Sequence, residues 1–420
     1  MEKLIKMFQI MTATFLVCSF LTLCSPSLGL CLQFDWSFEI VDYSVSDSNQ
    51  VSSIALDSNN RPAISYYDLL GDRYLRYVHK ASDGTWQYST VDPTRGSGDY
   101  SSLQFNPVTG YPAISYISNL FPTTYPDLKF AQFNGTNWEV SGPLASGPNE
   151  VDPYDTSLAF NPITKLPAIA YNAGTSGLGF LEYDGASWGE GTVPLPWRNM
   201  NNEGAQLKYK DDGKPAILYG TKTELELAIR DTDWDITVVD NNYPENAAGD
   251  HQNIGLEFDI HGNPHIVYMG EGSLKYAFFN GTNWDVNVFG LHCGRADLEL
   301  DNFGNPFIAY QRGSDIYFGY KDGGDWTFDW FAPEGYSMSN LIIDDFGKAH
   351  ISFMKWDSDV YADRNLYYAV GTPVAEPVPE PSTLFLLASG LIGLVGFRRK
   401  FRGNNQYLTS YSTILFSKSN

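Results

Sequence analysis

The sequence predicts an all-β protein, and three observations carry that prediction. One unit recurs seven times between residues 53 and 370, at a spacing of roughly 42 to 55 residues that suits four short strands. Large apolar residues recur at every second position, as in Ile64-x-Tyr66 and Leu103-x-Phe105, which is the period expected for strands. No sustained helical period occurs in this part of the chain.

The four segments of a unit are clearest in its first copy. They are Ser53–Asp57, Pro62–Tyr66, Leu75–Tyr77 and Asp83–Trp86. An Asp-Gly or Asn-Gly pair precedes most of the recurring tryptophans and predicts a tight hairpin turn. In the first hairpin, residues that tolerate positive φ recur at one position: Asn60, Gly213, Gly262, Gly304 and Gly347.

The two ends of the repeat are each incomplete. The seventh unit stops after Tyr368 without its tryptophan segment, whereas Asp35–Asp42 is a tryptophan-led strand with no unit before it. Both facts are explained if the N-terminal strand completes the last sheet of a ring, which removes an exposed sheet edge. We therefore predict a seven-bladed β-propeller over residues 35–370, closed by an N-terminal strand.

Two sets of recurring residues are expected to be structural. Tryptophans at one position should pack between blades, with sugar stacking as the alternative: Trp36, Trp86, Trp138, Trp188, Trp234, Trp284 and Trp326. Acidic or amide residues in the first hairpin should serve the turn, with calcium ligation as the alternative: Asp57, Asn106, Asn161, Asp259, Asp301 and Asp344. We predict no other cofactor and no metal site.

The N-terminus has the pattern of a secretory signal peptide. Lys3 and Lys6 precede an apolar stretch at residues 8–23, and small residues around Gly29 suit cleavage, so the predicted signal peptide is 1–29. A lipoprotein is the alternative, but Leu30 rather than a small residue precedes Cys31. Too few cysteines follow for a disulfide scaffold.

The C-terminus has three parts in a fixed order. After a predicted linker at 371–378, Pro379, Glu380 and Pro381 precede a short apolar stretch at residues 384–397. A basic cluster then follows, formed by Arg398, Arg399, Lys400 and Arg402. An apolar run followed by basic residues suits a short transmembrane helix with a cytoplasmic end. A plain membrane anchor is the alternative.

This order of parts resembles the PEP-CTERM sorting tail of bacterial exported proteins, here residues 379–402. The resemblance implies processing by an exosortase, anchoring in the inner membrane of a Gram-negative bacterium, and later residence at the outer surface or in the extracellular matrix. It also implies association with extracellular polysaccharide, as in a biofilm. The extension at 403–420 has no counterpart in such tails.

The composition limits the partners of the body. The formal net charge is −22 and aromatic residues make up 15% of the chain. Nucleic acids and anionic lipid headgroups would be repelled by this charge. An aromatic-rich acidic surface suits sugars, because rings stack on apolar sugar faces while carboxylates accept hydroxyl protons.

A ligand site is expected where the longer loops gather. Connections between blades and the loops after each Pro-x-Ile-x-Tyr strand share one face, at the mouth of the channel. The candidates on these loops are Asp99, Tyr100, Tyr154, Asp155, His251, Arg295, Tyr336 and Trp356.

An enzyme is the alternative to a binding protein. Asp83–Trp86 is similar to the Asp-box hairpin of sialidase-type propellers, and that resemblance implies a glycoside hydrolase acting on an acidic glycan. Such an enzyme needs three arginines around a carboxylate, and Arg95, Arg198 and Arg295 lie in connections between blades. We predict non-enzymatic polysaccharide binding or a purely structural role, with the hydrolase as the competing hypothesis.

Overall fold

The computed structural model describes the body of the chain with several gaps. The described residues are 32–46, 52–119, 126–146, 156–173, 177–190, 193, 204–243, 254–322, 324–332, 336–356 and 364–375. The predicted signal peptide, sorting tail and C-terminal extension lie outside them. Residues 34–373 form one compact unit. Within the described residues, no helix is long and apolar enough to cross a membrane.

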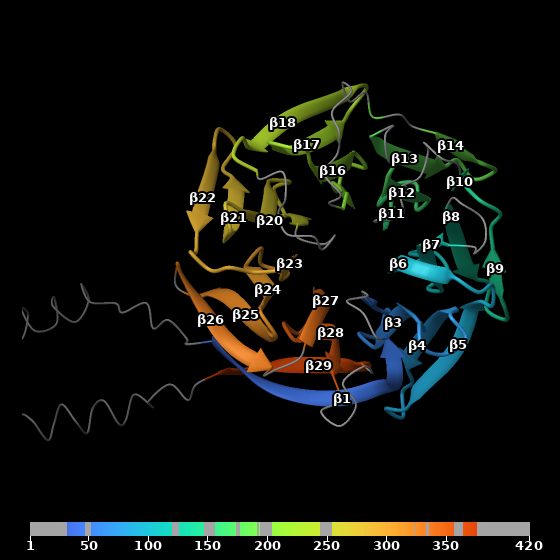
Figure 1. Ribbon diagram of the computed structural model, residues 1–420. Helices are drawn as coiled ribbons and strands as arrows, with labels where there is room; N and C mark the ends of the chain where they lie inside the picture. Colours follow the sequence, from blue (N-terminus) through green and yellow to red (C-terminus); the bar gives the residue numbers. More distant parts are fainter. Residues whose placement is uncertain are drawn as a thin grey trace, which may run out of the picture. The chain divides into compact units, whose positions relative to one another are not determined.

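Seven sheets form a ring of blades, each sheet running from an inner to an outer strand (Figure 1). Blade 1 is β2 (Ser53–Leu56), β3 (Pro62–Tyr67), β4 (Leu75–Lys80) and β5 (Trp86–Asp92). Blade 2 is β6 (Ser97–Phe105), β7 (Pro112–Ser118), β8 (Asp127–Phe133), β9 (Trp138–Val140) and β10 (Ala145–Ser146). Blade 3 is β11 (Thr156–Phe160), β12 (Pro167–Asn172), β13 (Leu178–Tyr183) and β14 (Trp188–Glu190).

The remaining blades repeat this order. Blade 4 is β15 (Gln206–Tyr209), β16 (Pro215–Gly220), β17 (Leu225–Arg230) and β18 (Trp234–Asp240). Blade 5 is β19 (Ile254–Phe258), β20 (Pro264–Gly270), β21 (Ser273–Phe279) and β22 (Trp284–Val288). Blade 6 is β23 (Arg295–Leu300), β24 (Pro306–Arg312), β25 (Asp315–Asp322) and β26 (Asp325–Ala332). The predicted seven-bladed β-propeller is confirmed.

Blade 7 is completed by the N-terminal strand, as the sequence predicts. Its strands are β27 (Tyr336–Ile343), β28 (Ala349–Trp356), β29 (Arg364–Ala375) and, on the outside, β1 (Leu32–Ser46). Strand β29 continues into the segment for which the sequence predicts a linker. The reason is pairing and packing, because Gly371 pairs with Ala349 and a Cβ on Gly371 would lie 2.8 Å from the Trp36 ring.

The recurring tryptophans pack between blades. Six of them meet an aromatic ring on the third strand of the preceding blade, with centroid distances of 5.0 to 5.5 Å. Trp86 of blade 1, for example, meets Tyr368 of blade 7 edge to face at 5.5 Å. Trp284 packs against the core cluster between blades 4 and 5. The structural role of this set is confirmed.

The first hairpins are built as predicted where an aspartate or asparagine begins the turn, whereas the turn of blade 4 begins at Lys210. Asp57 Oδ1 accepts hydrogen bonds from the backbone N–H groups of Asn59 and Arg61, both at 2.9 Å. Asn60 has a φ of 57°, and the glycines at the same position have φ between 75° and 84°. Local side-chain acceptance of this kind is ordinary turn chemistry. These residues therefore shape the turn.

The antiparallel order sorts the loops onto two faces. We call the side with the first hairpins and the tryptophan hairpins the hairpin face. The opposite side, with the loops between second and third strands and the connections between blades, is the connection face. Alternation along the innermost strands buries residues such as Leu103 and Leu207 between blades and turns their neighbours to the central channel.

Candidate ligand-binding site

A valine and an aspartate recur near or at the end of the outermost strand in three blades. They are Val41–Asp42 in β1, Val91–Asp92 in β5 and Val239–Asp240 in β18. The valines are buried, and each aspartate accepts a hydrogen bond from the tyrosine of the next blade's Pro-x-Ile-x-Tyr strand. The three bonds are Tyr66 Oη to Asp42 at 2.6 Å, Tyr116 Oη to Asp92 at 2.7 Å and Tyr268 Oη to Asp240 at 2.9 Å. The motif therefore links neighbouring blades.

A cation on the third strand pairs in register with each of these tyrosines. At the seam between blades 1 and 2 it is Lys129, whose Nζ lies 3.3 Å from Asp92. At the seam between blades 4 and 5 it is Lys275, 2.9 Å from Asp240. The side chains of both pairs are 12% exposed or less. We call these two the closed seams, because ion pairs fill them.

Hydrogen bonds and charge set the pKa values in the closed seams. Burial alone would raise the pKa of Asp92, but hydrogen bonds from Thr94 and Tyr116 and the charge of Lys129 outweigh it and lower that pKa. Asp240 follows the same course, with burial opposed by Lys275, Asn242 and Tyr268, and its pKa is also lowered. Both carboxylates are therefore ionised at neutral pH and hold a buried lysine.

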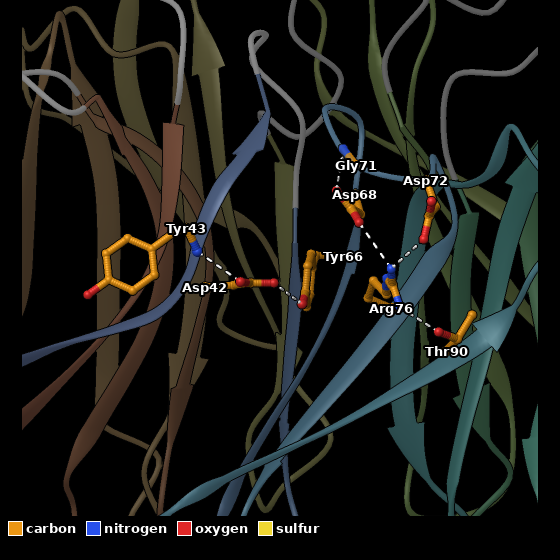
Figure 2. Close-up of polar contacts among 8 residues, drawn as sticks. All are labelled: Asp42, Tyr43, Tyr66, Asp68, Gly71, Asp72, Arg76 and Thr90. Carbon is orange, nitrogen blue, oxygen red and sulfur yellow. Dashed lines mark hydrogen bonds and ion pairs between the residues drawn. The ribbon is translucent and has the colours of Figure 1, made fainter. Parts of the chain in front are cut away.

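The seam between blades 7 and 1, where β1 closes the ring, is built differently. Its cation is Arg76, which pairs in register with Tyr66. The guanidinium Nη2 lies 3.3 Å from both Asp68 and Asp72, and Nη1 donates to Thr90 at 2.5 Å (Figure 2). Among the described residues no ion pair forms on Asp42, so the position that a lysine fills elsewhere stays open.

The loop after β3 holds Arg76 away from Asp42. It carries Asp68 and Asp72, and Asp68 Oδ1 accepts the backbone N–H of Gly71 at 2.8 Å. A Cβ on Gly71 would lie 2.3 Å from Asp68 Oδ2, so only glycine leaves that carboxylate in place. The loop is fixed to the closing strand because the N–H of Leu69 donates to the carbonyl of Val45 at 2.9 Å.

The result is a hollow on the connection face that we call the closure pocket. Its lining comprises Asp42, Tyr43, Tyr66, Asp68, Leu70, Gly71, Arg76 and Tyr88, and its volume is about 680 Å³. Ligand pockets commonly measure about 300–1,000 Å³. Tyr88 is 57% exposed, and its hydroxyl donates to the carbonyl of Val41 at 2.5 Å. Tyr43 also belongs to the lining, and its ring points to the opposite side of β1 from Asp42 (Figure 2).

The polar groups of the closure pocket are fixed before any ligand arrives. Burial, reinforced by the charge of Asp42, raises the pKa of Tyr66 far above its usual range, so its hydroxyl stays a donor and orients Asp42. Asp42, Asp68 and Asp72 outnumber the single guanidinium of Arg76. The pocket therefore favours neutral, hydroxyl-rich or cationic ligands and repels anionic ones.

The central channel is a poorer site. Its cavity measures about 80 Å³, room for a few waters only. Much of its polar lining has a structural task, since Ser53 Oγ accepts the N–H of Leu103 at 3.0 Å and Asp297 accepts that of Leu341 at 2.8 Å. Such bonds satisfy the free edges of the inner strands.

Charged side chains also meet in the channel. Lys208 contacts Glu257 and lies 4.0 Å from Glu299. Burial raises the pKa of Glu299, and repulsion from Glu257 adds to the rise. The cluster is thus an internal network around one lysine. Within the described residues, no group of three or more histidine, cysteine, aspartate or glutamate side chains could hold a metal ion.

The predicted site residues whose side chains are described lie on different blades. Asp99 and Tyr100 lie on β6 in blade 2, where Asn119 Nδ2 donates to Asp99 at 2.8 Å. Arg295 begins β23 and is only 4% exposed. Tyr336 begins β27 and Trp356 ends β28. Tyr154, Asp155 and His251 lie outside the described residues. Of the arginines of the hydrolase hypothesis, Arg95 is exposed between blades 1 and 2, Arg295 is buried in blade 6, and Arg198 is not described.

Sequence reasoning missed the residues of the closure pocket. A usable signal was present, because Val-Asp recurs at or near the end of three outer strands and a tyrosine recurs in the facing strand. What the sequence does not reveal is the direction in which Arg76 turns.

The C-terminal segment is identified by a family comparison. Residues 377–400 match the PEP-CTERM protein-sorting motif. The chain carries this sorting motif. The motif implies an exported protein that is sorted by an exosortase and anchored in a membrane before processing. No curated protein matches the chain.

Solved structures resemble the body in fold. Selenomethionine-substituted virginiamycin B lyase from Staphylococcus aureus is 9% identical, covers 81% of this chain and 100% of its own, and has a TM-score of 0.53. A catalytically inactive variant of that lyase with quinupristin, from the same organism, is also 9% identical, covers 80% and 99%, and has the same TM-score of 0.53. At this identity the likeness shows the propeller fold alone.

Proposed function

We propose that this exported protein binds a neutral, hydroxyl-rich glycan in the closure pocket. The observation that carries the proposal is the open seam, in which Asp42 keeps its tyrosine partner but lacks the cation that fills both closed seams. An oriented carboxylate beside exposed aromatic rings is a combination that suits sugar hydroxyls and sugar faces. The pocket volume of about 680 Å³ is sufficient for one or a few sugar units.

The destination supports a polysaccharide ligand. An exported protein sorted by an exosortase meets the polysaccharides of the cell envelope. We propose the outer surface or the extracellular matrix of a Gram-negative bacterium as its final location. A propeller that binds glycan there would attach itself to the matrix without catalysing a reaction.

The charge of the pocket separates this proposal from the hydrolase hypothesis. A sialidase-like site must hold a carboxylate with several free guanidinium groups. In the closure pocket the donors of Arg76 are already engaged by Asp68, Asp72 and Thr90. Uronic and sialic acids would therefore be rejected, and this is the property that an experiment can measure.

The test is a glycan array probed with the full chain, followed by calorimetry on the best neutral oligosaccharide. Asp42→Asn keeps an oxygen for Tyr66 but removes the charge, and should weaken binding by about tenfold or more, since hydrogen bonds to charged groups contribute about 1.5–3 kcal/mol. Asp345→Asn, on the hairpin face, is the matched control and should bind normally. Preference for acidic glycans, or equal affinity of both variants, would refute the proposal.

A further inference from the structure

Exposed apolar side chains recur on the hairpin face. We define the hairpin ring as Val108, Ile163, Ile260, Phe303 and Phe346, each in the first hairpin of a different blade. Their exposed fractions range from 64% for Ile163 to 85% for Phe303. Single exposed apolar residues are ordinary on a soluble protein, but a set in corresponding hairpins around one face indicates an interaction surface.

The turn itself does not require these side chains. The same turn in blade 1 carries Ser58 and Asn59, and in blade 4 it carries Asp211 and Asp212. In the five blades that carry the ring, the turn is shaped instead by the aspartate or asparagine at its start and by a residue with positive φ. Phe303 and Phe346 thus add apolar surface where polar residues would fold equally well.

Neighbouring hairpins touch, so the ring lies on a connected rim. Asn60 Nδ2 donates to Asp345 at 3.2 Å, linking blades 1 and 7. Asn161 Nδ2 donates to the carbonyl of Gly213 at 3.2 Å, linking blades 3 and 4. A Cβ on Gly304 would lie 3.8 Å from Cβ of Asp259, which brings the turns of blades 5 and 6 together. The rim can therefore meet a flat partner at several points together.

The chain leaves the propeller on this same face. Strand β29 is antiparallel to β28, and Gly371 of β29 pairs with Ala349, the residue that follows the first hairpin of blade 7. The sorting motif begins at residue 377 and its apolar stretch at Leu384. The residues from 376 to 384 span at most about 30 Å when extended. While the tail is anchored, the membrane is therefore within reach of the hairpin face.

We propose that the hairpin ring contacts the surface of the lipid bilayer that holds the sorting tail. Its aromatic and aliphatic side chains would enter the zone between headgroups and acyl chains, as the apolar face of an interfacial element does. The short tether raises the local concentration of lipid at the ring, so weak contacts suffice. The net charge of −22 restricts the partner to zwitterionic lipid, because anionic headgroups repel the body.

The experiment places an environment-sensitive NBD label on the full chain in vesicles of zwitterionic lipid. The label is attached at Phe303→Cys, with the four native cysteines replaced by serine or alanine. Ser314→Cys, exposed in the loop between β24 and β25 on the connection face, is the matched control. We expect a blue shift and quenching by lipid-borne doxyl groups at position 303 but not at position 314.

Additional variants and conditions separate lipid contact from other causes of the fluorescence shift. Phe346→Ser combined with Ile260→Ser should halve the shift at position 303 or reduce it further, and anionic lipid at low salt should reduce it as well. An equal response at both positions, or none at position 303, would overturn the proposal. A shift in detergent that grows with protein concentration would also overturn it, because a second copy would then cover the ring.

Discussion

The closed seams and the closure seam use one motif for two purposes. In all three, an aspartate at or near the end of an outer strand accepts a hydrogen bond from a tyrosine of the next blade. In the closed seams a buried lysine completes the cluster by pairing with the aspartate. At the closure seam Arg76 turns toward Asp68 and Asp72, and a pocket opens. A structural link thus becomes a candidate site when one cation changes partner.

The difference also separates stability from binding. In a closed seam, a buried lysine depends on its aspartate, so breaking the pair leaves a buried charge without compensation. At the closure seam Arg76 has other partners and Asp42 faces a hollow, so the same substitution should affect binding more than folding. Substitutions in both kinds of seam test whether folding depends on the closed seams and binding on the closure seam.

The strongest effect should come from removing the packing that holds the closing strand. Trp36 stacks on Phe331 at 4.4 Å and meets Phe318 edge to face at 5.2 Å. Trp36→Ala should lower the free energy of unfolding by about 3–5 kcal/mol, measured by denaturant titration. Tyr43→Ala, in the same strand with Tyr43 68% exposed, should change it by less than about 0.5 kcal/mol. Similar effects of the two variants would show that the strand does not clamp the ring.

The next largest effect should come from replacing the aspartate of a closed seam, compared with the same substitution at the closure seam. Asp92→Asn leaves the Lys129 charge buried without a carboxylate and should cost about 3 kcal/mol. Asp42→Asn should cost about 1 kcal/mol or less, because a neutral hydrogen bond to Tyr66 survives. Thermal melting of the two variants measures the difference. A larger loss of stability in Asp42→Asn than in Asp92→Asn would contradict the distinction between closed seams and the closure seam.

The closed seams should also make stability depend on pH. The folded-state pKa values of Asp92 and Asp240 are lowered, so the stability that these carboxylates provide is present above their unfolded value of about 3.9. It is lost as the pH falls through the lower folded values. Melting temperature should therefore drop below about pH 4, and the drop should be shallower in Asp92→Asn. Identical acid profiles would contradict this account.

A slight effect on folding, with a clear effect on binding, should come from Gly71→Ala. The added Cβ displaces the Asp68 carboxylate and releases Arg76 into the pocket, so affinity for a neutral glycan should fall by about tenfold, or about 1.4 kcal/mol. Gly142→Ala is the control, because a Cβ there meets nothing within 4 Å. Calorimetry on both variants decides the matter. Unchanged affinity in Gly71→Ala would show that the position of the Asp68 carboxylate does not matter for binding.

The sequence predicts the fold well because the repeat is local and periodic. Alternating segments, glycines at positive φ and a recurring tryptophan each determine a neighbouring contact. The orphan strand at Asp35–Asp42 even reveals how the ring closes. The predicted site residues lack such a basis, since only their positions in loops single out Asp99, Tyr100 and Arg295. Whether Arg76 pairs with Asp42 or with Asp68 depends on a loop conformation that no period encodes.

The proposal that the closure seam binds a ligand is tested most directly by a crystal structure of the full propeller with a neutral oligosaccharide. We expect sugar density between Asp42, Tyr88 and Arg76, with a sugar hydroxyl on the Asp42 carboxylate. Density at the channel mouth beside Asp99 and Tyr100, or against a closed seam at Asp92 or Asp240, would contradict the assignment of the site.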